Sequence, residues 1–320
     1  MTNGKSSPSS LLFHLSFLPC LMNRDWKLAR RSLPIGERTL VMGVLNVTPD
    51  SFSDGGQFFH IDKALVQAER MIAEGADIID VGGESTRPGG DTAVPAEEEL
   101  RRVIPVIEHF VKSAAVPISI DTTKSEVARA ALEAGAEIVN DISGLRFDPR
   151  VADEAARAGA GLVLMHSRGT LATLHQLPPV PDIFEEVIRS LRDSVAMARQ
   201  RGVKGESIVI DPGIGFGKSQ EQNIELIAKL DQLVAAFPEY PLLIGTSRKS
   251  FLGKLLKQAV ESVEANPGEV VPVTERLNGT MATITAAILR GAGIVRVHDV
   301  KAAVESVTVA DAIRQRSANV

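Results

Sequence analysis

The chain has 320 residues, 44% of them hydrophobic, which is enough apolar content for a globular protein with an ample core. Its formal net charge of −5 at pH 7 argues against a nucleic-acid-binding surface and against a polybasic membrane patch. A single cysteine, Cys20, excludes an intrachain disulfide framework and is typical of a reducing compartment, so we expect a cytoplasmic protein.

The first 22 residues differ in composition from the rest of the chain. A polar start precedes a short apolar stretch, Leu11–Met22, which is too short to span a bilayer. A secretory signal is one interpretation, but no A-x-A cleavage site follows, and His14 and Pro19 interrupt the stretch. We therefore expect residues 1–22 to be a disordered extension or not part of the native start, and residues 23–320 to form one domain.

From Thr39 onward, short apolar runs alternate with stretches of helical periodicity. The predicted strands are Thr39–Asn46, Ile78–Gly82, Pro117–Asp121, Ile138–Ile142, Gly161–His166, Ile208–Asp211, Leu242–Thr246 and Ile294–Val297. The predicted helices include Ile61–Glu74, Ala96–Val111, Ser125–Ala134, Asp182–Arg201, Gln220–Ala236 and Thr274–Arg290. This alternation predicts a single (β/α)8 TIM barrel, with a doubly wound open sheet as the alternative. The polar segment Lys257–Val273 is expected to be a surface insertion.

Polar residues follow the predicted strands, at the face where barrels of this kind carry their active sites. They stand at or just after the ends of the third, fourth, sixth and seventh strands, at Asp121, Asn140, Asp211 and Lys249. Such groups are costly in apolar surroundings unless they pair or bind something. Together they offer donors and acceptors suited to a flat, nitrogen-rich heterocycle. A satisfied internal polar network is the alternative.

A second group of residues is suited to an anion. Thr86 and Arg87 lie in ESTRPGG, while Arg296 and His298 flank the end of the last strand in RVHDV. Guanidinium groups bind phosphate oxygens in a bidentate manner, and the end of the eighth strand is a frequent phosphate position. Asn46 offers a neutral oxygen appropriate to Mg²⁺, which keeps most of its waters. Ordinary surface charge is the alternative for Arg296 and His298.

The turn DPGIGFGK after the sixth strand carries glycines in G-x-G-x-G spacing. A lone glycine-rich turn is weak evidence for a nucleotide site. We expect this turn to let the backbone approach a flat ligand and to present Phe216 at the rim. His166, in LMHSRG, is expected to be a hydrogen-bonded core or rim residue rather than a ligand or base.

Seven motifs in order carry a family resemblance. The chain resembles the dihydropteroate synthases of the folate pathway from Thr39 to Ile313, through NVTPDSFSDGG, DIIDVGGESTRPG, SIDTTK, VNDISG, DPGIGFGK, SRKSFLG and RVHDV. The resemblance implies a pterin-binding barrel that condenses (7,8-dihydropterin-6-yl)methyl diphosphate with 4-aminobenzoate to give 7,8-dihydropteroate and diphosphate. It also implies Mg²⁺ as cofactor, a homodimer, and an enzyme of the class that sulfonamides inhibit.

The resemblance further implies roles for individual residues. The pterin contacts would be Asp121, Asn140, Asp211 and Lys249; the diphosphate contacts Thr86, Arg87, Arg296 and His298; the Mg²⁺ contact Asn46; and the 4-aminobenzoate pocket Phe52, Pro88, Phe216 and Ser250. Asp54, Asp121 and Lys249 are expected to be catalytic. The glycine-rich loops that carry Phe52 and Pro88 are expected to complete the second pocket when diphosphate and Mg²⁺ are bound.

Two alternative functions share part of this pattern. A pterin-binding methyltransferase, which uses a methylated folate and a corrinoid partner, would not need the SFSDGG and STRPG loops or RVHDV, and all three are present. A non-catalytic pterin-binding barrel would be expected to lose Lys249 or Arg296, and neither is lost.

Overall fold

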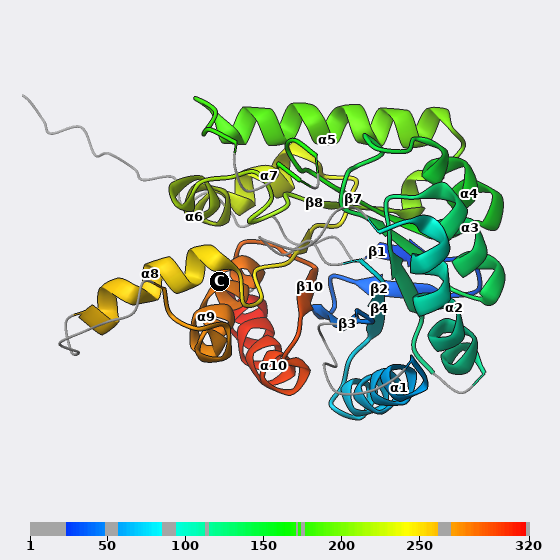
Figure 1. The fold of residues 1–320 in the computed structure, drawn as a ribbon. Coiled ribbons are helices and arrows are strands. Elements are labelled where there is room, and N and C mark those ends of the chain that lie inside the picture. The colour runs from blue at the N-terminus through cyan, green and yellow to red at the C-terminus, as the bar shows by residue number, and fades with distance from the viewer. Residues whose placement is uncertain are drawn as a thin grey trace, which may run out of the picture.

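A barrel of eight parallel strands forms the centre of the molecule (Figure 1). The computed structural model describes residues 24–48, 57–84, 94–112, 115–170, 172–173, 177–261 and 270–317. The barrel strands are β3 (Leu40–Asn46), β4 (Ile78–Gly82), β5 (Ile118–Asp121), β6 (Ile138–Asp141), β7 (Gly161–Met165), β8 (Ile208–Asp211), β9 (Leu243–Ile244) and β10 (Ile294–Val297). The predicted (β/α)8 architecture is confirmed.

Pairing of the strands follows the order β8-β7-β6-β5-β4-β3-β10-β9. A parallel bridge between Ile210 and Leu242 joins the two ends of this ladder, which closes the barrel. The strand predicted at Leu242–Thr246 is shorter than expected, because only Leu243 and Ile244 pair with β10. Beyond them, the Thr246 hydroxyl accepts a hydrogen bond from Thr283 at 2.9 Å, so the chain turns toward the neighbouring helix.

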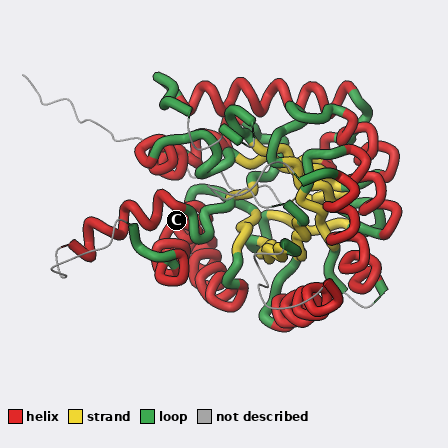
Figure 2. Tube along the Cα trace, in the orientation of Figure 1, coloured by secondary structure: helices red, strands yellow, loops and turns green. Residues whose placement is uncertain are grey.

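Helices lie around the barrel, as Figure 2 shows. They are α1 (Gln57–Ala73), α2 (Ala96–Val111), α3 (Ser125–Ala134), α4 (Arg150–Ala158), α5 (Ile183–Gln200), α6 (Gln220–Ala228), α7 (Leu230–Ala236), α8 (Ser250–Glu261), α9 (Leu277–Leu289) and α10 (Val300–Ser317), with short 3-10 turns η2 (Gly205–Ser207) and η3 (Val273–Glu275). Within the described ranges, no helix is both long and apolar enough to cross a membrane.

Three predictions outside the strands need correction. The helix predicted at Thr274–Arg290 begins only at Leu277, after the short turn η3. The stretch Gln220–Ala236 is two helices, because Lys229 leaves helical geometry at φ −106° and ψ 21°. The surface insertion expected at Lys257–Val273 begins later, since α8 continues through Glu261. Residues 262–269 lie outside the described part of the chain.

An antiparallel hairpin, β1 (Arg24–Lys27) and β2 (Ser32–Ile35), was not predicted. Trp26 is fully buried, and its indole nitrogen donates to the carbonyl of Ser207 at 2.9 Å. The apolar side chains of the hairpin pack on residues near the starts of the barrel strands: Leu40, Met42, Ile78, Ile138 and Ile294. The hairpin therefore plugs the amino-terminal end of the barrel and leaves the carboxyl end for chemistry.

Candidate active site

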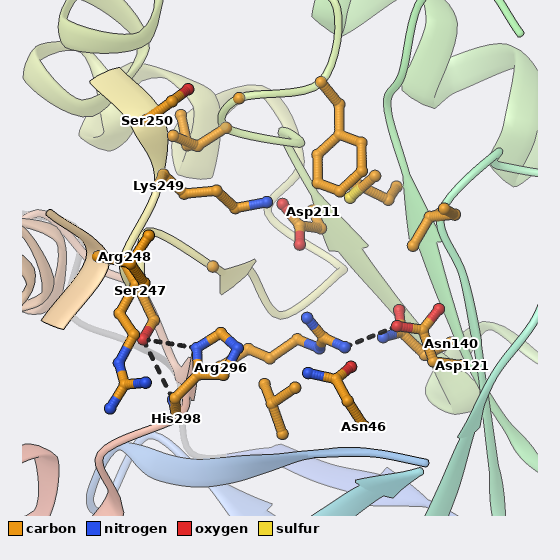
Figure 3. A pocket seen from close by; sticks show the side chains of 18 of the residues that line it. Asn46, Asp121, Asn140, Asp211, Ser247, Arg248, Lys249, Ser250, Arg296 and His298 are labelled. Atoms are coloured by element: carbon orange, nitrogen blue, oxygen red, sulfur yellow. Dashed lines mark hydrogen bonds and ion pairs between the residues drawn. The ribbon is translucent and has the colours of Figure 1, made fainter. Parts of the chain in front are cut away.

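A cavity of about 390 Å³ lies at the carboxyl ends of the barrel strands (Figure 3). Nine of the side chains expected at the site line it: Asn46, Asp121, Asn140, Asp211, Phe216, Lys249, Ser250, Arg296 and His298. The other expected residues, Phe52, Asp54, Thr86, Arg87 and Pro88, lie outside the described residues. Because these nine side chains come from the ends of six different strands or the loops that follow them, the parallel arrangement of the strands brings them together.

Arg296 reaches from β10 to two carboxylates, and Figure 3 shows its contact with Asp121. Its Nε lies 2.6 Å from Asp80 Oδ2, and its Nη2 lies 2.6 Å from Asp121 Oδ2. Burial lowers the pKa of Arg296, but Asp80 and Asp121 raise it more, so the guanidinium stays charged. The surface-charge interpretation of Arg296 is wrong, since only 19% of its side chain is exposed. A diphosphate contact by this residue stays a prediction.

Asp80 is a member of the cluster that the motifs did not indicate. Its side chain is fully buried in β4, and Oδ2 accepts hydrogen bonds from Arg296 and from Asn140 Nδ2, the latter at 3.0 Å. Oδ1 has no hydrogen-bond partner in the described part of the chain. A signal was present in the sequence, because an aspartate interrupts the apolar run Ile78–Gly82 and a buried carboxylate needs a partner.

Two carboxyl groups of the cavity hold protons more tightly than usual. Burial raises the pKa of Asp121 to about 7, with Arg296 lowering it and Asp80 raising it further. Burial likewise raises the pKa of Asp211 to about 6, against a 2.7 Å hydrogen bond from the backbone N–H of Gly213. Near neutral pH, these groups are therefore poised to change charge when a ligand binds.

Lys249 lies between the carboxylates and an aromatic ring. Burial and the charge of Arg296 lower the pKa of Lys249 to about 8, while Asp211 and Asp121 oppose the shift. Its Nζ lies 3.9 Å from the centre of the Phe216 ring, and in Figure 3 the side chain points toward Asp211. A cation over an aromatic face at this distance is attracted by the ring. Lys249 thus connects the acidic cluster with the aromatic side of the cavity.

The turn Asp211–Lys218 has a shape that admits only glycine at a key position. Gly213 has φ +66°, and a Cβ there would lie 1.8 Å from the carbonyl oxygen of His166. The half-buried Lys218 donates from Nζ to the carbonyls of Gly213 at 2.7 Å and Phe216 at 3.1 Å. These contacts hold Phe216 at the rim, as the sequence predicted. His166 is a buried rim residue, and burial lowers its pKa well below the usual value, so it is neutral.

The opposite rim of the cavity is formed after β9 and β10. Ser247 Oγ lies 3.0 Å from His298 Nδ1 and accepts the backbone N–H of His298 at 3.1 Å. Arg248 has φ +58°, which is uncommon for a residue with a side chain, and its Nε donates to Asp299 at 2.9 Å. Arg276 Nη1 donates to the carbonyl of Arg248 at 3.0 Å. Sequence reasoning missed the contributions of Ser247, Arg248 and Arg276.

The residues near Asn46 are compatible with a hydrated Mg²⁺ ion. A Cβ placed on Gly82 would lie 3.9 Å from Asn46 Oδ1 and 3.8 Å from Asp121 Oδ2, so both oxygens flank this glycine. No group of three or more histidine, cysteine, aspartate or glutamate side chains in the described ranges could hold a metal ion. Mg²⁺ commonly binds through one or two protein oxygens together with water and substrate phosphates. The oxygens of Asn46 and Asp121 are therefore compatible with this kind of Mg²⁺ coordination.

Known proteins of similar sequence and fold include several dihydropteroate synthases. Residues 42–298 match the family model described as pterin binding enzyme. A dihydropteroate synthase from Synechocystis is 49% identical over 278 residues, covering 87% of this chain and 91% of that protein. The structure of dihydropteroate synthase from Xanthomonas albilineans in complex with 7,8-dihydropteroate has a TM-score of 0.76 and 41% identity, covering 90% of this chain and 98% of that one. A Yersinia pestis dihydropteroate synthase with a sulfonamide drug complex has a TM-score of 0.80 and 38% identity, covering 91% and 99%.

Proposed function

This chain belongs to the dihydropteroate synthase family of pterin-binding enzymes, and we propose that its barrel cavity is where the two substrates are joined. The enzyme condenses (7,8-dihydropterin-6-yl)methyl diphosphate with 4-aminobenzoate to give 7,8-dihydropteroate and diphosphate, a step of tetrahydrofolate biosynthesis. The observation that supports the site is the convergence of Asp121, Asn140, Asp211, Lys249 and Arg296 on one cavity.

In the proposal, the pterin ring lies against the acidic cluster. Asp121 and Asp211, when ionised, accept hydrogen bonds from ring N–H and amino groups, and Asn140 adds an acceptor oxygen. The raised pKa values of the two carboxyl groups favour a ligand that brings several donors or a positive charge. Asp121 and Lys249 are the catalytic residues proposed within the described cavity.

Departure of diphosphate requires positive charge around the leaving group, on the side of the reacting carbon away from the pterin ring. The bond between the pterin methylene carbon and the diphosphate oxygen breaks, and its electron pair leaves with diphosphate. Arg296 and His298, which line the same cavity, are proposed to bind this anion together with Thr86 and Arg87. Asn46 is proposed to hold Mg²⁺, which when bound supplies further positive charge to the leaving group.

The 4-aminobenzoate site is proposed at the rim. Phe216 offers an aromatic face, and Ser250 begins α8, whose amino-terminal end attracts a carboxylate. Phe52 and Pro88 are proposed to complete this pocket. The amine nitrogen then attacks the pterin methylene carbon and loses one proton, with positioning and electrostatics supplying the rate rather than a protein nucleophile.

We further propose that the enzyme acts as a homodimer in the cytoplasm. Large apolar side chains are exposed on neighbouring helices, with Leu255 on α8 and Leu277 on α9. Burial of such side chains in a twofold interface would remove apolar surface from water. Light scattering of the purified protein would measure the mass, and a monomer at micromolar concentration would contradict the dimer.

Product formation tests the proposed Mg²⁺ dependence and the site. Purified enzyme is mixed with both substrates, with Mg²⁺ or with a chelator, and dihydropteroate and diphosphate are quantified. We expect equal amounts of the two products with Mg²⁺, and a large loss of rate with Asp211→Asn. The same preparation given a methylated folate and a corrinoid acceptor should transfer no methyl group. Full activity in the chelator would contradict the role proposed for Asn46.

A further inference from the structure

We infer that Asp80 is a positioning residue that fixes the side chains of Arg296 and Asn140 before the pterin substrate binds. Asp80 does not line the cavity, so it acts through these two neighbours. The inference rests on the proposed pterin site, since it assigns a specificity role to residues of that site.

Asp80 sets the orientation of the Asn140 amide. Its nitrogen lies 3.0 Å from Asp80 Oδ2, and an ionised carboxylate can only accept hydrogen bonds. The amide must therefore turn its NH₂ group toward Asp80, and its oxygen is directed away from that contact. Asn140 then presents an acceptor, and Asp80 makes the site selective for a ligand that offers a donor at this position.

Two carboxylates hold the guanidinium of Arg296. Asp80 engages Nε at 2.6 Å, and Asp121 engages Nη2 at 2.6 Å, so the planar group is held at two points. Two-point attachment removes the rotation about the last side-chain bonds that a single contact would leave. The remaining N–H groups are thereby aimed in a fixed direction, ahead of any anionic ligand.

Burial of Asp80 in β4 carries a free-energy cost. The carboxylate is fully buried, and its Oδ1 has no partner among the described residues. Apolar residues in place of buried ion pairs are often neutral or stabilising, so stability alone is a weak reason for an aspartate here. Positioning of two site residues provides a stronger reason.

A spectroscopic experiment tests the geometry without any ligand. In protein labelled with ¹⁵N-arginine, the Nε–H resonance of Arg296 is assigned by its loss in Arg296→Lys. We expect this proton to resonate downfield and to exchange slowly with water, as a charge-assisted hydrogen bond requires. Asp80→Leu should move the resonance upfield and speed its exchange. A wild-type resonance at the position of solvent-exposed arginines would overturn the inference, whatever the enzyme's activity.

Kinetics then separate positioning from a purely structural role. Asp80→Asn keeps an acceptor oxygen but loses the charge, whereas Asp80→Leu keeps the branched shape and loses both. We expect kcat/KM for the dihydropterin diphosphate to fall roughly ten- to a hundredfold in the leucine variant, the range for hydrogen bonds to charged groups, and less in the asparagine variant. KM for 4-aminobenzoate should change little. An activity order that simply follows thermal stability would overturn the positioning role.

A double-mutant cycle addresses the route of action. If Asp80 acts through Arg296, the Asp80→Leu change should cost much less in an Arg296→Lys background, while fully additive losses would contradict the inference. Asp311→Asn is the matched control, because Asp311 is also a buried carboxylate and binds Thr39 at the opposite end of the barrel, through the backbone N–H at 2.7 Å and the hydroxyl at 2.8 Å. This control should lower stability and leave both the Arg296 resonance and kcat/KM unchanged.

Discussion

At the scale of single residues, the chemistry of the cavity depends on how tightly it holds protons. Asp121 and Lys249 have pKa values displaced toward each other, to about 7 and about 8, because both are buried near charges of both signs. A carboxylate and an ammonium with such values change charge within a narrow range of pH. Ligand binding and proton uptake are therefore coupled at this site.

A bell-shaped pH profile is expected for kcat/KM of the dihydropterin diphosphate. Below a pH of about 7, Asp121 becomes protonated and loses acceptor capacity, so activity falls as the pH falls. Above a pH of about 8, Lys249 loses its proton and its charge, so activity falls as the pH rises. Steady-state rates from pH 5.5 to 9.5 would measure both limbs. If Asp121→Asn retains the acid limb unchanged, that limb belongs to another group.

Arg296→Lys is expected to lower activity even though the charge is retained. A lysine ammonium cannot engage Asp80 and Asp121 with the planar, two-point geometry that the guanidinium has. We expect transition-state stabilisation to fall by about 1.5–3 kcal/mol, the usual range for a charge-assisted hydrogen bond. Initial rates at varied substrate concentrations measure the change, and an unaltered kcat/KM would show that Arg296 does not contribute to the reaction.

The sequence indicated most of the site residues at strand ends, but it missed Ser247 and Arg248 in the motif SRKSFLG, and it missed Asp80 within an apolar run. Asp121 and Asp211 each end an apolar run and begin a polar loop, so a barrel pattern is enough to bring them together. Asp80 lies in the middle of a strand, where its pairing with Arg296 depends on three-dimensional geometry that spacing does not encode. Likewise, the two carboxylates around Arg296 could not be foreseen from RVHDV alone.

At the scale of secondary-structure elements, apolar runs located the barrel strands well, because a parallel sheet buried on both faces needs continuous hydrophobic stretches. The hairpin β1–β2 escaped prediction, since four-residue strands with mixed polarity carry little periodic signal. β9 was predicted too long, since the prediction extended the strand past Ile244 to Gly245 and Thr246. The Thr246 hydroxyl accepts a hydrogen bond from Thr283 of α9, and only Leu243 and Ile244 pair with β10.

The hairpin should contribute to stability without taking part in catalysis. Trp26 is fully buried at the amino-terminal end of the barrel, opposite the cavity. Trp26→Ala should lower the free energy of unfolding by about 3–5 kcal/mol, as expected for truncating a large buried aromatic residue. Denaturant unfolding measures this loss, and kcat/KM of the folded variant should stay near the wild-type value. A large kinetic defect in well-folded protein would show that the plug influences the site.

At the scale of the whole molecule, the two substrates are expected to bind in order. The proposed 4-aminobenzoate pocket would combine Phe216 and Ser250 with Phe52 and Pro88, and the family resemblance predicts that the loops carrying the latter pair engage diphosphate and Mg²⁺. Calorimetry should detect binding of the dihydropterin diphosphate alone but very weak binding of 4-aminobenzoate alone. Diphosphate, Mg²⁺ and a pterin analogue together should restore its affinity. Equal affinity with and without these ligands would indicate a preformed pocket.

The barrel has its weakest strand junction between β8 and β9, and this junction affects the dynamics of the barrel. β9 contributes only two residues, and its junction with β8 consists of the Ile210–Leu242 bridge and a 3.0 Å hydrogen bond from the amide of Ile210 to Pro241. Local opening is easiest where few backbone hydrogen bonds must break. We expect the amide proton of Ile210 to exchange with solvent faster than those of β5 and β6. Lys249 and Ser250 follow β9 and line the cavity. Local opening at this junction would therefore displace one side of the cavity and allow product release while the other strands stay paired.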